Sequence, residues 1–105
     1  MPDMDELYTV IVQEPAAEML VQHARFLTQV SVKAANRLLA EFKKQTASLE
    51  TTPERCPWLY HPMVQERKYR KLIFEKQYML IFQIVGKKVF VDAMVDCRQD
   101  YIYLL

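Results

Sequence analysis

The sequence contains a single glycine, Gly86, among its 105 residues, and this scarcity excludes whole classes of protein. Phosphate-binding loops and dinucleotide fingerprints need several glycines at fixed spacing, because the backbone must approach a phosphate closely. Neither motif can be formed by this chain. We therefore exclude most nucleotide-dependent enzymes.

Cysteine is scarce as well. Cys56 and Cys97 are the only two, and neither belongs to a CxxC pair or to a Cys/His spacing that binds zinc. A reducing cytosol would keep both as thiols. We expect no metal site, no cofactor and no disulfide.

Long apolar runs are missing, since no window reaches the length of a membrane span. The first ten residues, MPDMDELYTV, are acidic and lack the basic-then-apolar order of a secretory signal. We expect a soluble, cytoplasmic protein with no membrane partner.

Hydrophobic residues make up 51% of the chain and charged residues 26%, close to the globular average. The length suits one domain, residues 1–105, with a core that needs no metal or disulfide.

The net charge is only +1, but the charges are unevenly distributed. Residues 1–52 carry five Lys/Arg and seven Asp/Glu, whereas residues 53–105 carry nine and six. Taken whole, the charge is weak support for a nucleic-acid partner. The basic character of the C-terminal half is the stronger signal.

The first half of the sequence predicts one strand and two helices. Residues 7–13 are rich in β-branched and aromatic side chains and predict a strand. Pro15 is typical of a first helical turn, and Ser31 of the N-cap of a second helix that runs to Leu49. The predicted buried stripes are Ala16, Met19, Leu20, His23, Ala24, Phe26, Leu27 and Val30, then Val32, Ala35, Leu38, Leu39, Phe42, Thr46 and Leu49.

The second half predicts a proline-rich loop and three strands. Residues 53–64 hold three prolines and no period, so they form a loop that packs through Trp58 and Tyr60. Strands are predicted at 69–74, 78–85 and 89–95, with short turns that make them antiparallel neighbours. In the last strand, one face is predicted to meet the helices: Val89, Val91, Ala93 and Val95.

The expected fold class is therefore α+β with the order β-α-α-β-β-β. A helical hairpin packs on one face of a mainly antiparallel sheet, and the other face is expected to be more polar.

Four cations cluster at the start of the strand that is predicted at residues 69–74: Arg67, Lys68, Arg70 and Lys71. Arg98 follows the last strand. If Arg70 and Arg98 converge, two arginines beside exposed aromatics can bind a phosphodiester and stack a base. The alternative is a solvated basic edge that prevents sheet-to-sheet pairing.

Other polar residues have simpler interpretations. His23 lies on an apolar helix stripe, as a satisfied core histidine does, whereas His61 in the proline-rich loop is a conceivable general base. Asp92 and Asp96 are expected to form ion pairs because cations lie nearby, and no third ligand for a metal is evident.

Three segments carry a family resemblance. "YRKLIFEKQYMLIFQIVGKKVFVDAMVDCRQDY" resembles the C-terminal half of the RelE/ParE family of bacterial toxins, with its Tyr-Arg pair, apolar strand and final Arg-x-Asp. "YTVIVQEPAAEMLVQHARFL" resembles that family's first strand and helix, and "AANRLLAEFKKQTASL" its second helix. The resemblance runs from about Tyr8 to Tyr101.

The resemblance implies the toxin of a type II toxin-antitoxin module, of the kind linked to plasmid stabilisation, bound and neutralised by a cognate antitoxin in a hetero-oligomer. RelE-like members cut mRNA on the ribosome without a metal, and this is the first interpretation. The alternatives are a ParE-like inhibitor of DNA gyrase, or an inactive member that only binds its antitoxin. The antitoxin is expected to cover apolar surface near the helical hairpin or the final strand, and the apolar C-terminal residues IYLL motivate this expectation.

For the nuclease, attack by a 2′-OH on the adjacent phosphate needs a base, an acid and cations. The resemblance implies that Arg70 and Arg98 stabilise the developing charge and that Arg67, Lys68 and Lys71 hold the substrate. Tyr101 or Tyr103 matches a C-terminal tyrosine of some members, and Glu66 or His61 is the candidate base. Two features depart from the pattern: Asp96 and Cys97 stand where many nuclease members have a histidine, and the protein is nearly neutral.

Overall fold

Two helices and four strands make up the part of the chain that the computed structural model describes, residues 7–99 and 105. Along the chain they are β1 (Thr9–Val12), α1 (Glu14–Thr28), α2 (Val32–Ser48), the 3-10 turn η2 (Pro53–Arg55), β2 (Arg70–Phe74), β3 (Tyr78–Val85) and β4 (Lys88–Asp96). The predicted β-α-α-β-β-β order and α+β class are confirmed.

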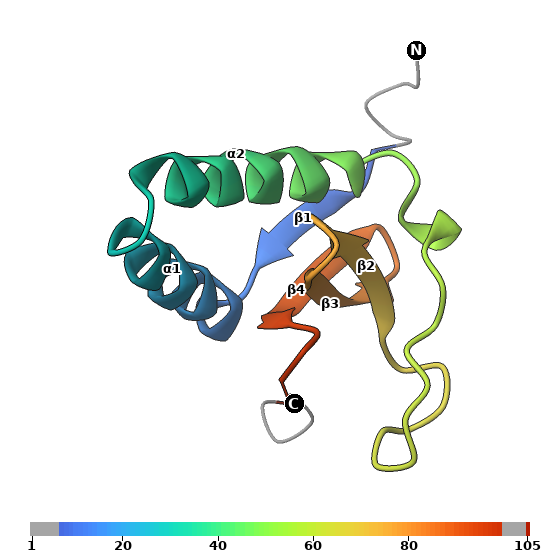
Figure 1. The fold of residues 1–105 in the computed structure, drawn as a ribbon. Coiled ribbons are helices and arrows are strands. Elements are labelled where there is room, and N and C mark those ends of the chain that lie inside the picture. The colour runs from blue at the N-terminus through green and yellow to red at the C-terminus, as the bar shows by residue number, and fades with distance from the viewer. Residues whose placement is uncertain (1–6, 100–104) are drawn as a thin grey trace.

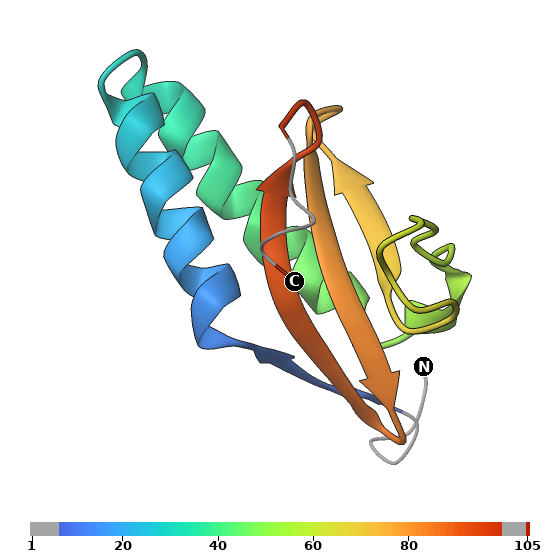
Figure 2. The same cartoon turned by 90° about the horizontal axis from the view of Figure 1, so that it is seen from below.

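The sheet has the strand order β1-β4-β3-β2 (Figures 1 and 2). β2, β3 and β4 form the predicted antiparallel set. β1 pairs in parallel with β4, so the first strand of the chain lies beside the last. The two helices form a hairpin that covers one face of this sheet.

Local sequence explains where the helices begin. Pro15 lies in the first turn of α1, where its missing N–H is not needed. The Ser31 hydroxyl accepts a hydrogen bond from the Ala34 N–H at 3.1 Å, as the predicted N-cap requires. The expected stripe is partly wrong, however: the Phe26 side chain is 65% exposed and Val30 is 76% exposed. Both lie near the turn of the hairpin, beyond the reach of the sheet.

A bulge in β4 changes which residues face the helices. Ile81 pairs with Ala93 whereas Phe82 pairs with Val91, so Asp92 is an extra residue on β4. An extra residue shifts a period-two pattern by one, and the side chains beyond it switch faces. Val89 and Val91 meet the helices as predicted. The prediction is wrong beyond the bulge, where the other face receives Ala93 and Val95.

The second face of the sheet is apolar, and the expectation of a more polar face is wrong. Its buried residues are Leu59, Tyr69, Met79, Ile81, Ala93 and Val95, with Val64 and Cys97 packed against them. Leu59 and Val64 come from the loop after η2, which folds over this face. These two residues of the loop therefore extend the core of the domain.

The turn between β2 and β3 makes a first prediction. Glu75 and Lys76 have φ angles of 51° and 65°, a left-handed conformation that strains non-glycine residues. We expect Lys76→Gly to raise the free energy of unfolding by about 0.5–1 kcal/mol, as the relieved strain outweighs the added freedom of the unfolded chain. Lys88→Gly, in a strand, is the matched control and is expected to destabilise. Urea unfolding that ranks the two variants equally would contradict the prediction.

Candidate functional site

Backbone hydrogen bonds at the edge of the sheet join the two ends of the loop that runs from residue 60 to residue 68. The Leu59 N–H donates to the Tyr69 carbonyl at 2.7 Å, and the Lys71 N–H donates to the Pro57 carbonyl at 3.0 Å. Trp58 and Arg70 form an antiparallel bridge between these two bonds. The loop thus leaves and rejoins the sheet at one place and stands out from β2 (Figure 1).

Arg70 holds the proline-rich segment to the sheet. Its guanidinium carbon lies 3.8 Å from the centre of the Trp58 ring. One terminal nitrogen donates to the Cys56 carbonyl at 2.8 Å and to the Glu54 carbonyl at 3.3 Å. The Nε atom is buried with no hydrogen-bond partner among the described residues. This arrangement packs the arginine between sheet and loop.

Arg98 is held by a buried carboxylate. Its Nε donates to Asp96 Oδ1 at 3.0 Å and a terminal nitrogen donates to Asp96 Oδ2 at 2.6 Å, while its backbone N–H donates to Oδ1 at 2.9 Å. The Asp96 side chain is 7% exposed and that of Arg98 69%. Hydrogen bonding by Arg98 lowers the pKa of Asp96, and the same bonds raise the pKa of Arg98. The ion pair predicted for Asp96 is confirmed.

The two arginines do not converge, so that expectation is wrong. Arg70 pairs with Phe82 at one end of β2, whereas Asp96, two residues before Arg98, pairs with Tyr78 at the opposite end of β3. The antiparallel register therefore places Arg70 and Asp96 four residues apart along β3 and on opposite sides of that strand. The two guanidinium groups also bind different partners, since Arg70 donates to the Glu54 and Cys56 carbonyls and Arg98 donates to Asp96.

His23 of α1 lies beside the Asp96 end of the sheet. Its ring meets the Tyr78 ring edge to face, with centroids 5.6 Å apart. Burial lowers the pKa of His23, and the nearby Asp96 carboxylate opposes that shift. Asp92, by contrast, accepts a hydrogen bond from Gln83 Nε2 at 2.6 Å. Its expected ion pair is not among the ion pairs of residues 7–99 and 105.

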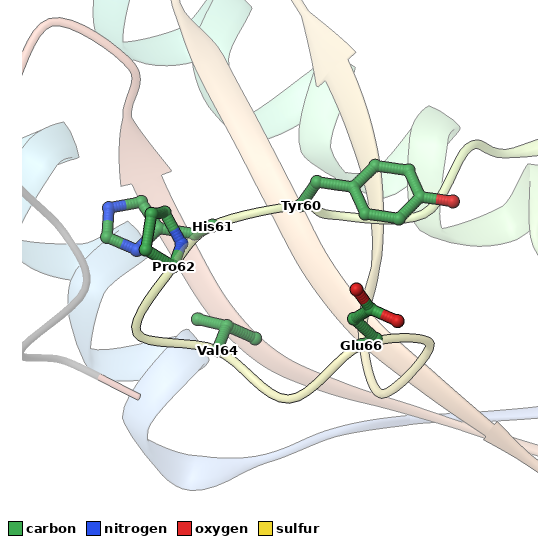
Figure 3. A pocket seen from close by; sticks show the side chains of 5 residues that line it. All are labelled: Tyr60, His61, Pro62, Val64 and Glu66. Carbon is green, nitrogen blue, oxygen red and sulfur yellow. The ribbon is translucent and has the colours of Figure 1, made fainter.

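A pocket of about 280 Å³ opens in the loop itself (Figure 3). Its lining residues are Tyr60, His61, Pro62, Val64 and Glu66. Both candidate bases, His61 and Glu66, are therefore found in one pocket. The Tyr60 phenol and the Glu66 carboxylate lie at one end in Figure 3, and His61 lies at the other with Pro62. The Met63 N–H donates to His61 Nδ1 at 3.1 Å.

The predicted substrate-holding cations lie on the chain directly after this pocket. Arg67 and Lys68 are exposed, and Lys71 is half-buried. Arg67 has a φ angle of 57°, and Lys68 Nζ lies 5.2 Å from the centre of the Tyr69 ring. Tyr101 and Tyr103 lie outside the described residues, as does most of the IYLL segment.

Tyr60 was not among the predicted site residues, although it lines the pocket with its side chain 67% exposed. The available signal was the aromatic residue within a three-proline loop, which we interpreted as packing. The backbone bonds that join segments 57–59 and 69–71 bring Tyr60 back toward Glu66, and these bonds belong to the tertiary structure.

The two thiols, Cys56 and Cys97, are buried and half-buried. Burial raises the pKa of Cys56 and of Cys97, which keeps both protonated. Among residues 7–99 and 105, no three His, Cys, Asp or Glu side chains come together in a way that suits a metal ion. The helices in the same part of the chain are too short or too polar to span a membrane.

Comparison with known proteins supports the fold. The sequence matches no protein-family model and no curated protein. Six chains of solved structures do match. One belongs to a structure described as the chromosomal ParDE TA system from P. aeruginosa; the likeness has a TM-score of 0.67 and 13% sequence identity, and it covers 87% of this chain and 97% of that chain. The fold expected from the RelE/ParE resemblance is confirmed.

Proposed function

We propose that this chain is the toxin of a toxin-antitoxin module and that RNA is its target. The observation that carries the first part is the fold shared with nearly the whole of a chain from a ParDE system. The order and spacing of the sequence segments that resemble RelE/ParE toxins support the same assignment.

An antitoxin has apolar surface to cover on this chain. At the turn of the helical hairpin, the side chains of Phe26, Val30 and Val32 are 65%, 76% and 63% exposed. Patches of this kind mark protein interaction sites. We propose that the cognate antitoxin binds this end of the hairpin as a helical or extended segment.

RNA is supported as the target by the loop. Arg67 and Lys68 are exposed cations that follow directly after a pocket lined by an aromatic ring, an imidazole and a carboxylate. Cations that hold phosphates beside an aromatic platform are typical of single-stranded RNA binding. Cleavage of mRNA on the ribosome is the activity that we propose for this surface.

Inhibition of DNA gyrase is the second candidate, and one observation favours it. Arg70 and Arg98 lie on opposite sides of β3 and are held by different partners, so they are not arranged to stabilise one phosphorane together. A toxin that acts by binding needs no such pair.

Expression of the chain alone is expected to arrest growth, and co-expression with the neighbouring gene product to restore it. In a translating extract, primer extension should show new cuts within ribosome-occupied codons. Replacing Arg67 and Lys68 with alanine is expected to weaken cleavage roughly tenfold, because phosphate contacts are lost. Lys44→Ala, an exposed lysine of α2, is the control.

The outcomes separate the candidates. Intact mRNA together with blocked supercoiling would support the gyrase inhibitor and contradict the RNA target. Undisturbed growth with a folded, expressed protein would contradict the toxin assignment itself.

A further inference from the structure

The pocket in the loop has the composition of a nucleobase site. Tyr60 offers an exposed aromatic ring, and Glu66 offers a carboxylate with two acceptor oxygens. The ion pairs found among residues 7–99 and 105 do not involve Glu66. Its acceptors are thus available to a ligand that enters the pocket.

Backbone hydrogen bonds hold the loop that carries these groups. The backbone bonds at Leu59 and Lys71 close its base, and the buried Leu59 and Tyr69 anchor its two ends. The Val64 N–H donates to the His61 carbonyl at 3.0 Å and tightens the tip. A base can therefore bind without first ordering the loop, which avoids an entropic cost.

His61 adds a donor at the other end of the pocket. Because its Nδ1 accepts the Met63 N–H, the neutral ring carries its proton on Nε2. The same bond occupies the lone pair that a general base would use. The pocket therefore offers one N–H donor and a pair of carboxylate acceptors.

Base chemistry selects among the possible ligands. Guanine presents two adjacent N–H donors, N1–H and the N2 amino group, on its Watson–Crick edge, beside the O6 acceptor. Adenine, cytosine and uracil each place an acceptor next to a donor on that edge, so they cannot satisfy both oxygens of a carboxylate. A cationic peptide would also suit Glu66, but Arg67 and Lys68 directly after it would repel such a partner and attract phosphates.

We infer that the Tyr60, His61 and Glu66 pocket binds an unpaired guanine base of an RNA, with Glu66 accepting its two N–H groups and Tyr60 stacking on its ring. This inference rests on the proposed RNA target. It gives Glu66 the role of selecting the base, in place of the general-base role expected from the sequence.

The inference is tested with short labelled oligouridines that carry one central guanosine, inosine or adenosine. Their binding to the 105-residue chain is measured. Guanosine is expected to bind roughly tenfold more tightly than adenosine, and inosine, which lacks the N2 amino group, to fall between them. Glu66→Gln should abolish the preference while retaining the weaker binding through Arg67 and Lys68. Glu50→Gln, an exposed carboxylate at the end of α2, should leave the preference intact.

Tyr60 variants separate stacking from recognition. Tyr60→Ala is expected to weaken binding of all three RNAs by roughly tenfold, whereas Tyr60→Phe keeps the stacking ring and the affinity. Equal affinity for the three RNAs, or a preference that survives Glu66→Gln, would overturn the inference. If growth arrest and mRNA cleavage persist in either case, the proposed function stands without it.

Discussion

Arg70→Ala is expected to lower the free energy of unfolding by about 2–4 kcal/mol, a large fraction of the stability of a small domain. The substitution removes the stacking on Trp58 and two hydrogen bonds to the Glu54 and Cys56 carbonyls. Arg70→Lys should recover only part of the loss, since an ammonium group cannot reproduce the planar fork of a guanidinium.

Urea unfolding measures the change in stability, and Trp58 provides a local probe of the same transition. Trp58 is the only tryptophan of the chain, so its fluorescence reports on the contact with Arg70, while circular dichroism reports on the whole domain. The exposed Arg67→Ala is the control and should change stability by less than about 0.5 kcal/mol. An Arg70→Ala variant as stable as the wild type would show that the contact contributes nothing.

This result bears on any test of toxicity. If the chain arrests growth as proposed, a loss of arrest in Arg70→Ala is expected from the lost loop contacts alone, whether or not the arginine touches a substrate. Variants of exposed residues such as Arg67 and Lys68 are therefore better tests of a role in binding RNA.

Asp96→Asn is expected to lower the melting temperature at neutral pH by roughly 5 °C or more. The asparagine keeps the size of the side chain but loses the charge that accepts three hydrogen bonds from Arg98. Hydrogen bonding by Arg98 lowers the pKa of Asp96 in the folded state. The Asp96 carboxylate therefore contributes its full stabilisation at pH values above its pKa in the unfolded chain, about 3.9. This stabilisation is lost as the pH falls through the lower pKa of Asp96 in the folded protein.

The difference in melting temperature between the wild type and Asp96→Asn should consequently become smaller as the pH falls below about 4. Thermal unfolding across this range measures it, with Glu50→Gln as an exposed control. If this difference in melting temperature stayed constant between neutral and acidic pH, the charge of Asp96 would not contribute to stability.

Local signals in the sequence were sufficient for the elements themselves. β3 was predicted with the bounds that it has, because a turn precedes Tyr78 and Gly86 follows Val85. The Ser31 cap was predictable for a similar reason, since it depends on a hydroxyl and an N–H three residues apart.

The errors concern contacts between distant segments. The bulge at Asp92 exists only in relation to β3, so the alternation within β4 cannot reveal it. Likewise, Arg70 bonds to carbonyls 14 and 16 residues earlier in the chain, which no local pattern identifies. The sequence shows where the cations stand along the chain, but their partners follow from tertiary structure.

The parallel pairing of β1 with β4 sets an order of events during synthesis. Thr9–Val12 leaves the ribosome long before Lys88–Asp96, yet its backbone partners belong to that last strand. Contacts this distant in sequence form late and slowly. A nascent chain can assemble the helical hairpin early, but its first strand stays unpaired until β4 has emerged. The complete sheet can therefore form only after residues 88–96 have emerged from the ribosome.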